Sequence, residues 1–421
     1  MSKTQWILSQ LTRQLWFRSS LFAVLAVITA LVAIAIKSFI PPTVSGIIGT
    51  DAVDKILGIL ASSMLAVTTF SLNIMVSAYN TASSSVTPRA TRLLLEDRTT
   101  QNVLATFIGS FLYSLVGIVA LGMGAYGRQG RVVLFFVTLM VIVMIVITLL
   151  RWIQHLSQFG RMAETSQRVE EATALPLAER LRDPCMGCSP WHGDVEPTTD
   201  FPLMPCSVGY LQHVDLRRLS DFAEKHSVWL YLNTRPGVFI HLTCPLLWSQ
   251  KALSPEQSGE LREAFTIGAQ RSFDQDPRFG LSVLSEIASR ALSPAVNDPG
   301  TAIDIIGRAV RLFSQPDGAD VVDTPYYRLF IRPAELNDMF DDIFTPIARD
   351  GAALVEVHIR LQKALIALAR FRPERYESEA RRHSEQALER ARQALTYKGD
   401  FHILEVLAGE FTATGLSNRP E

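Results

Sequence analysis

The chain has 421 residues, which is enough for two or three domains. Its 40 lysines and arginines nearly balance its 41 aspartates and glutamates, which argues against a nucleic-acid-binding protein with a dominant basic surface. Hydrophobicity is uneven: the first 150 residues hold four long apolar segments, and the rest resembles an ordinary soluble sequence. The sequence therefore predicts an α-helical transmembrane bundle of four spans, followed by a mixed α+β, mostly helical, cytoplasmic domain.

The first apolar segment runs from about residue 19 to residue 40. Residues 1–18 before it combine an apolar helical face with basic side chains and two tryptophans, Trp6 and Trp16. This composition predicts an interfacial N-terminal segment that lies at the membrane surface. A cleaved signal peptide is the alternative, because Ala33-Ile-Ala35 resembles a cleavage site.

The second segment, about residues 56–80, is apolar but carries a row of small and polar residues that we call the polar stripe. No charged residue occurs from Ile56 to Pro88, so the stretch is long enough to span a bilayer. Steps of three and four place the stripe on one helical face. Its residues are Ser62, Ala66, Thr69, Asn73, Ser77 and Asn80. One interpretation is packing against a neighbouring helix, and the other is the lining of a water-filled pathway in an oligomer.

The third and fourth segments, about residues 102–126 and 132–150, are separated by a short turn at 127–131. The third segment has a row of small residues that predicts close packing against the striped helix. This row consists of Thr106, Ser110, Ser114, Gly117 and Gly124. In the packing interpretation, the amide of Asn73 hydrogen-bonds to Ser110 or Ser114.

The distribution of basic residues in the short flanks predicts the orientation. Nine lysines and arginines lie on one side and four on the other, which places the N-terminus, the middle loop and the C-terminal domain in the cytoplasm. The middle loop carries Arg89, Arg92 and Arg98 at the cytoplasmic end of the striped helix. These arginines either meet lipid headgroups or surround the cytoplasmic mouth of a pathway.

The soluble part begins with a connecting helix predicted over residues 151–182. Residues 183–206 read as a loop rich in cysteine and proline, residues 207–250 as a small α/β unit, and residues 251–421 as a helical cytoplasmic region. Cys185 and Cys188 in the loop are weak candidates for a zinc site, because the second ligand pair of the strong signature is missing. Free thiols are the alternative, and we expect no metal or cofactor.

Two helix starts in the soluble part have Asp directly before Pro, at Asp276-Pro277 and Asp298-Pro299. Helix capping explains both pairs without a functional site. Arg271, Arg290 and Asn297 remain, and they are candidates for an anion site at these helix ends. The phosphate-loop, nucleophile-elbow, HExxH and calcium-loop motifs are absent from the sequence, so we do not expect an enzyme.

Several stretches resemble a known family of bacterial multi-pass membrane proteins, the domain of unknown function 2254. They are Thr69-Phe-Ser-Leu-Asn73, Ser85-Val-Thr-Pro-Arg89, Leu95-Glu-Asp-Arg98, Gln101, Phe107-Ile-Gly109 to Tyr113, Gly209-Tyr-Leu-Gln-His-Val-Asp215, Arg235-Pro-Gly237 and Ala291-Leu-Ser-Pro-Ala-Val-Asn-Asp-Pro299. The resemblance covers about residues 15–370. It implies a multi-pass inner-membrane protein with a cytoplasmic C-terminal part, and no established activity accompanies it. The loop with Cys185 and Cys188 falls between the matching blocks.

Two classes of function follow from these observations. The leading hypothesis is a homo-oligomeric, channel-like conduit for ions or small solutes, with the polar stripe along its axis and a cytoplasmic domain that gates or senses. Its partners are the lipid bilayer, copies of the same chain and the transported ion or solute. The alternative is a membrane-anchored scaffold or sensor whose helices only pack and whose cytoplasmic domain binds a partner. The oligomeric state separates the two, because four helices are too few to enclose a pathway within one chain.

Overall fold

The computed structural model describes most of the chain and divides it into two units. The structure describes scattered positions between residues 6 and 32, and then residues 52–95, 97–124, 127–156, 162–191, 201–316 and 325–413. One unit, the membrane unit, comprises Ile7–Thr165. The other, the soluble unit, comprises Met1–Trp6 together with Ser166–Glu421.

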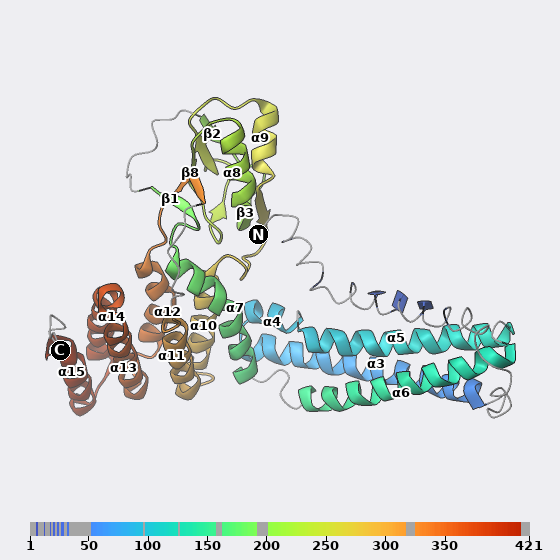
Figure 1. Cartoon of the computed structure of the whole chain (residues 1–421). Coiled ribbons are helices and arrows are strands. Elements are labelled where there is room, and N and C mark those ends of the chain that lie inside the picture. The colour runs from blue at the N-terminus through green and yellow to red at the C-terminus, as the bar shows by residue number, and fades with distance from the viewer. Residues whose placement is uncertain are drawn as a thin grey trace, which may run out of the picture. The chain divides into compact units, whose positions relative to one another are not determined.

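The membrane unit contains three long helices that lie side by side (Figure 1). Stretches of 30, 24 and 26 residues in these helices are long and apolar enough to cross a membrane: Ala52–Thr81, Thr99–Gly122 and Arg131–Leu156. Helix α5 packs against both α3 and α6, and Leu57, Tyr113 and Leu134 form one of the shared apolar cores. The helices of this unit are α3 (Ala52–Ser85), α4 (Pro88–Leu95), α5 (Arg98–Gly122) and α6 (Gly127–Leu156).

The described spans differ from the expected ones mainly at their ends. Helix α3 has 34 residues and is about 50 Å long, so it extends beyond a hydrocarbon core of about 30 Å. The basic loop after it folds in part as the short helix α4. Residues 127–131, which the sequence predicted as a turn, belong to α6, and α5 ends before Gly124, which takes a left-handed conformation (φ +71°). The predicted first span, 19–40, lies largely outside the described residues.

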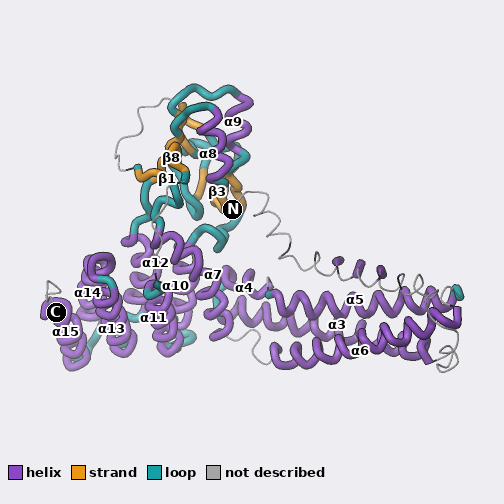
Figure 2. The backbone as a smooth tube through the Cα atoms, viewed as in Figure 1, coloured by secondary structure: helices purple, strands orange, loops and turns teal. Residues whose placement is uncertain are grey.

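The soluble unit is a mixed α+β domain with two small sheets beside a larger group of helices (Figure 2). Its helices are α7 (Met162–Arg182, whose first residues belong to the membrane unit), α8 (Leu216–Lys225), α9 (Pro255–Arg262), α10 (Pro277–Ala291), α11 (Pro299–Phe313), α12 (Leu336–Asp350), α13 (Val355–Phe371), α14 (Pro373–Ala394) and α15 (Lys398–Ala413). Its strands are β1 (Cys188–Pro190), β2 (Phe201–Leu203), β3 (Gly209–Val214), β4 (Leu230–Leu232), β5 (Phe239–Ile240), β6 (Leu247–Ser249), β7 (Phe265–Gly268) and β8 (Tyr326–Ile331).

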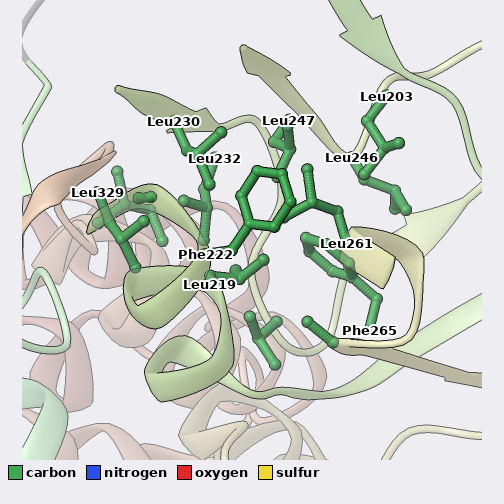
Figure 3. Close-up of a cluster of buried hydrophobic side chains, with 14 of the residues drawn as sticks. Leu203, Leu219, Phe222, Leu230, Leu232, Leu246, Leu247, Leu261, Phe265 and Leu329 are labelled. Carbon is green, nitrogen blue, oxygen red and sulfur yellow. The ribbon is translucent and has the colours of Figure 1, made fainter. Parts of the chain in front are cut away.

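The five-stranded sheet has the order β1-β8-β4-β6-β2, and the three-stranded sheet has the order β5-β3-β7. Strand β8 pairs in parallel with β1 and β4, and the other pairs are antiparallel. Helix α8 covers the sheet through Leu219 and Phe222, which lie among Leu230, Leu232 and Leu247 (Figure 3). Burial of these side chains stabilises the fold by about 2 kcal/mol for each residue.

Helix caps and an aromatic core organise the rest of the soluble unit. As predicted, Asp276 and Asp298 cap α10 and α11 by accepting hydrogen bonds from the backbone N–H groups of Phe279 and Thr301. Helices α10 to α14 pack around buried aromatic side chains, which include Phe313, Phe340, Phe344 and Tyr376. The Tyr376 hydroxyl donates to the Phe313 carbonyl (3.0 Å), so the polar end of this ring is satisfied inside the core.

Two regions contain strands that the sequence did not predict. The Cys/Pro-rich stretch contributes β1 and β2, and the region expected to be helical contributes β7. These strands have only three or four residues, too few to show an alternating pattern. Their partners determine them, since β1 pairs with the distant β8 and β2 with β6. Helices α6 and α7 are described as separate helices, with residues 157–161 outside the described part.

Candidate functional site

The polar stripe lies on the outward face of α3. All six of its residues are exposed, and apolar residues that are also exposed, such as Phe70 and Val76, flank it. On a helical wheel the buried residues of α3 form a second row, centred roughly 180° from the stripe. This buried row consists of Val53, Leu57, Leu60, Met64, Thr68, Ser71 and Met75. The helix therefore has one packing face and, opposite to it, one polar face.

The hydroxyl and amide groups of the stripe differ in how they are satisfied. The Ser62 hydroxyl donates to the Gly58 carbonyl (3.1 Å), and the Thr69 hydroxyl donates to the Leu65 carbonyl (2.9 Å). Such bonds to the preceding turn allow a hydroxyl to face lipid. The amides of Asn73 and Asn80 have no hydrogen-bonding partner among the described residues. These two side chains thus need a partner beyond the described residues.

Helix α5 packs on the face of α3 opposite to the stripe. A Cβ atom added to Gly117 would lie 3.0 Å from Leu57 Cδ1, which shows how closely the two helices approach. Ser110 and Ser114 are buried, and the Ser114 hydroxyl donates to the Ser110 carbonyl (2.9 Å). The expected packing of α5 against α3 is present. The predicted pairing of Asn73 with Ser110 or Ser114 is wrong within one chain, because the exposed Asn73 points away from that contact.

Polar groups on the buried side of the bundle are paired with each other. The Trp152 indole on α6 donates to the hydroxyl of Ser71 on α3 (3.0 Å), and Tyr113 on α5 contacts Thr138 on α6 (3.0 Å). Each pair joins residues that are distant in the sequence, so the spacing within one helix could not reveal it. The polar contacts between the described helices therefore involve residues outside the stripe.

Asp97 and His155 lie in contact where α5 begins and α6 ends. Asp97 caps α5 by accepting from the Thr100 backbone N–H (2.8 Å) and hydroxyl (2.5 Å). His155 Nε2 lies 2.9 Å from the same carboxylate, and Asp97 is buried. The sequence did not predict this contact, because residues 97 and 155 are far apart in the chain. The contact joins the start of α5 to the end of α6.

The predicted mouth residues are only partly described. Arg89 is exposed on α4, which packs through the buried residues Ala90 and Thr91. The side chains of Arg92 and Arg98 lie outside the described part of the chain. The placement of Arg89 is compatible both with a contact to lipid headgroups and with a ring at a pathway entrance.

The predicted anion-site residues are not brought together. The guanidinium of Arg271 makes two hydrogen bonds to the Asp276 carboxylate (2.7 and 2.9 Å), so its charge is already paired. Arg290 lies at the other end of the 15-residue helix α10, about 20 Å along its axis. Asn297 is exposed in the turn before α11, with φ +50°. Helix capping accounts for this region, and the three residues form no common site.

The cysteines of the β1 region are packing residues. Cys188 is buried in the core of the sheet, and Cys185 packs against that core. Burial and the nearby Asp183 raise the pKa of Cys188 to about 12, which disfavours the thiolate that a metal requires. His192 lies outside the described residues. In the part of the chain that the structure describes, no group of three histidine, cysteine, aspartate or glutamate side chains is placed to hold a metal ion.

Trp6 is a described residue of the predicted interfacial segment. It is buried in the soluble unit, where its ring stacks on His213 (5.3 Å between centroids) and its indole N–H donates to Asp274 (2.9 Å). Most of residues 1–18 lie outside the described part, so their location at the membrane surface stays a prediction. Trp6 itself contacts protein in this structure.

Comparisons with known proteins agree with the membrane helices. The sequence model of a family described as "Predicted membrane protein (DUF2254)" matches residues 12–367. Uncharacterized proteins of Mycobacterium tuberculosis and Mycobacterium bovis are 29% identical over 269 residues, which is 60% of this chain and 50% of each relative. The chain thus spans about half the length of the curated relatives that it matches. No solved structure matches the chain significantly.

Proposed function

The chain belongs to the DUF2254 family of predicted membrane proteins, and from that premise we propose that it is a homo-oligomeric conduit for ions or small solutes. The observation that carries this proposal is the outward polar face of α3, opposite to the face that packs on α5. A packing role within one chain would bury this face. It is exposed, and its amides lack partners among the described residues.

The physical argument concerns the amide of Asn73. This residue lies close to the middle of the charge-free stretch from Ile56 to Pro88. An amide that faces hydrocarbon without a partner costs several kcal/mol. Assembly around a common axis removes this cost, because the stripe then faces water and the stripes of the other copies.

The size of the membrane unit supports assembly rather than a pathway within one protomer. Three described helices are candidate spans, and their shared interior is filled by residues such as Leu57, Tyr113 and Leu134. The pathway therefore has to lie between copies, and a ring of three or more chains is the simplest arrangement. The exposed apolar residues of α6, among them Met140 and Ile147, then face lipid.

The remaining assignments follow from the same arrangement. We place the protein in the bacterial inner membrane with four spans and with both termini in the cytoplasm, as the distribution of basic residues predicts. Arg89 then lies at the cytoplasmic mouth. We assign gating or sensing, rather than catalysis, to the soluble unit, which forms most of the chain.

The test is conduction by the full-length protein in planar bilayers, together with its oligomeric state in detergent. Asn73→Leu places a ring of apolar side chains in the pathway, and dewetting should abolish conduction while the oligomer remains. A matched pair supplies the control: Thr69→Leu changes the stripe, whereas Thr148→Leu makes the same change on α6. Thr69→Leu should impair conduction and Thr148→Leu should not.

Two results would overturn the proposal. One is an intact oligomer of Asn73→Leu that conducts as well as the unchanged protein. The other is an unchanged protein that is a monomer or a simple dimer and does not conduct. The second result would favour a membrane-anchored scaffold whose soluble unit binds a partner.

A further inference from the structure

A cavity of about 250 Å³ in the soluble unit lies between the end of α7, the start of α8 and Tyr326 of β8. Three arginines line it: Arg180 and Arg182 from α7, and Arg217 from α8. The cavity is separate from the polar stripe, and all its lining residues lie between 176 and 326. It therefore offers a site whose chemistry does not depend on the proposed conduit.

Arg180 is the buried member of the three arginines. Only 8% of its surface is exposed. Within the described residues its guanidinium makes one hydrogen bond, a long one (3.5 Å) from Nη2 to the Gln275 carbonyl. Burial, together with the charge of Arg235, lowers the pKa of Arg180 to about 10. A buried guanidinium with one long hydrogen bond is costly, although the charges of Asp276 and Asp183 offset part of that cost, and a bound anion would complete its surroundings.

The other two arginines are also available to a ligand. Arg182 and Arg217 are exposed, and neither forms an ion pair with a described carboxylate. Arg218, the next residue on α8, does form one, with Glu263 (2.5 Å). The unpaired arginines thus gather at the cavity, whereas their neighbour on the same helix is paired.

Two carboxylates, Glu179 and Asp183, line the cavity as well, and the charge of Asp183 acts on Arg180. Asp183 accepts hydrogen bonds from the backbone N–H groups of Cys185 (3.0 Å) and Gly187, so it is occupied in shaping the loop before β1. Glu179 is exposed to solvent. Three guanidinium groups against these two carboxylates leave a net positive site.

The start of α8 adds backbone donors to the positive site. Asp215 caps the helix by accepting from the Arg218 N–H (3.1 Å), so the N–H groups of Leu216 and Arg217 in the first turn have no partner within the helix. Such groups favour a bound anion. The rest of the wall is apolar and aromatic, with Met186, Val214 and Tyr326.

We propose that this cavity binds an organic phosphate. Three arginines and the start of a helix suit the two negative charges and three acceptor oxygens of a phosphate monoester better than the single charge of a carboxylate. The apolar wall beside them receives the body of the molecule. Arg180 supplies the buried contact, and Arg182 and Arg217 hold the phosphate from the rim.

Calorimetric titration of the full-length protein in detergent tests the proposal, with adenosine monophosphate and inorganic phosphate as probes. Adenosine monophosphate should bind saturably, and inorganic phosphate more weakly because it has no body to fill the apolar part. Arg217→Gln should weaken binding of adenosine monophosphate about tenfold, since it removes a charge-assisted hydrogen bond. Arg218→Gln removes a neighbouring charge outside the cavity and should change the affinity less than about twofold.

The comparison of Arg217→Gln with Arg218→Gln distinguishes binding in the cavity from general attraction of the ligand by positive charge. Arg217 is exposed, so its replacement should leave the fold unchanged. Arg180→Gln should abolish binding. Because Arg180 is buried, this variant is informative only if its unfolding midpoint without ligand is near that of the unchanged protein. The absence of saturable binding would overturn the proposal. An equal loss in Arg217→Gln and Arg218→Gln would do the same. Equal affinity for both probes would refute the organic ligand.

Discussion

Helices α3 and α14 carry rows of residues with the same spacing but opposite exposure. On α14 the row Tyr376, Ala380, His383, Ala387 and Ala391 is buried against the soluble unit. On α3 the row Ser62, Ala66, Thr69, Asn73 and Ser77 is exposed. Both rows have steps of four, three, four and four, which is the spacing of one helical face.

The difference between the two helices lies in the solvent that each meets. Outside its buried row, α14 presents charged residues to water, and pairs such as Glu377 with Arg381 (3.1 Å) need no other partner. The exposed polar row of α3 has apolar neighbours such as Phe70 and Val76 that suit lipid. A polar outer face is therefore ordinary on α14, whereas on α3 it requires a polar partner that lipid does not supply.

The largest expected effect is a loss of folding stability at low pH, caused by buried histidines on α14 and α13. Burial lowers the pKa of His383 on α14, and of His358 on α13, to about 4 from an ordinary value of 6.5, and the charges of Arg382 and Arg390 act in the same direction. As pH falls below 6.5 the unfolded chain takes up protons first, so stability that is complete above pH 6.5 is lost toward pH 4. Between pH 7 and pH 5 each histidine should lower the free energy of unfolding by about 2 kcal/mol.

Denaturant unfolding of the full-length protein at the two pH values measures this loss. His383→Leu or His358→Leu should remove about half of the pH dependence that the two histidines cause. His402→Ala is the matched control, because His402 is exposed on α15. An unfolding free energy that stays constant between pH 7 and pH 5 would contradict the buried, neutral state of these rings.

A smaller effect is expected on the packing face of α3. Ser71→Ala removes the hydroxyl that accepts the hydrogen bond of the Trp152 indole N–H (3.0 Å) and should lower the stability of the membrane unit by about 1 kcal/mol. Conduction should persist, because Ser71 lies opposite to the stripe. The same change in the exposed stripe, Ser77→Ala, should leave the unfolding midpoint in detergent unchanged. If Ser77→Ala were the more destabilising change, the assignment of the two faces would be reversed.

The sequence predicted those features that depend on neighbours along the chain. The Asp-Pro pairs predicted the caps of α10 and α11. Charge-free length located three of the spans. Each of these signals arises from contacts within a turn or a helix, so a single sequence contains it.

Features that join distant residues could not be predicted in this way. The small residues of α5 predicted its packing against α3, but the periodicity of α3 did not show that this contact lies opposite to the polar stripe. The contact of Asp97 with His155 and the burial of Arg180 depend on how separate elements meet. The strand β1 exists because β8 pairs with it, and three residues carry too little pattern to show it beforehand.

The smallest effect is expected from replacing an exposed amide on α14, and this variant is the control for the same kind of change on α3. Gln386→Leu on α14 makes the same kind of change as Asn73→Leu on α3, since each replaces an exposed amide by an apolar side chain. On α14 the lost amide was hydrated, leucine and glutamine have similar helix propensities, and one exposed leucine is tolerated on a soluble surface. The free energy of unfolding should therefore change by less than about 0.5 kcal/mol, and conduction should be unaffected. Denaturant unfolding and bilayer recordings on both variants measure these effects. A loss of conduction in Gln386→Leu as large as that in Asn73→Leu would mean that exposed amides matter wherever they lie, and the polar stripe would then have no special relation to a pathway.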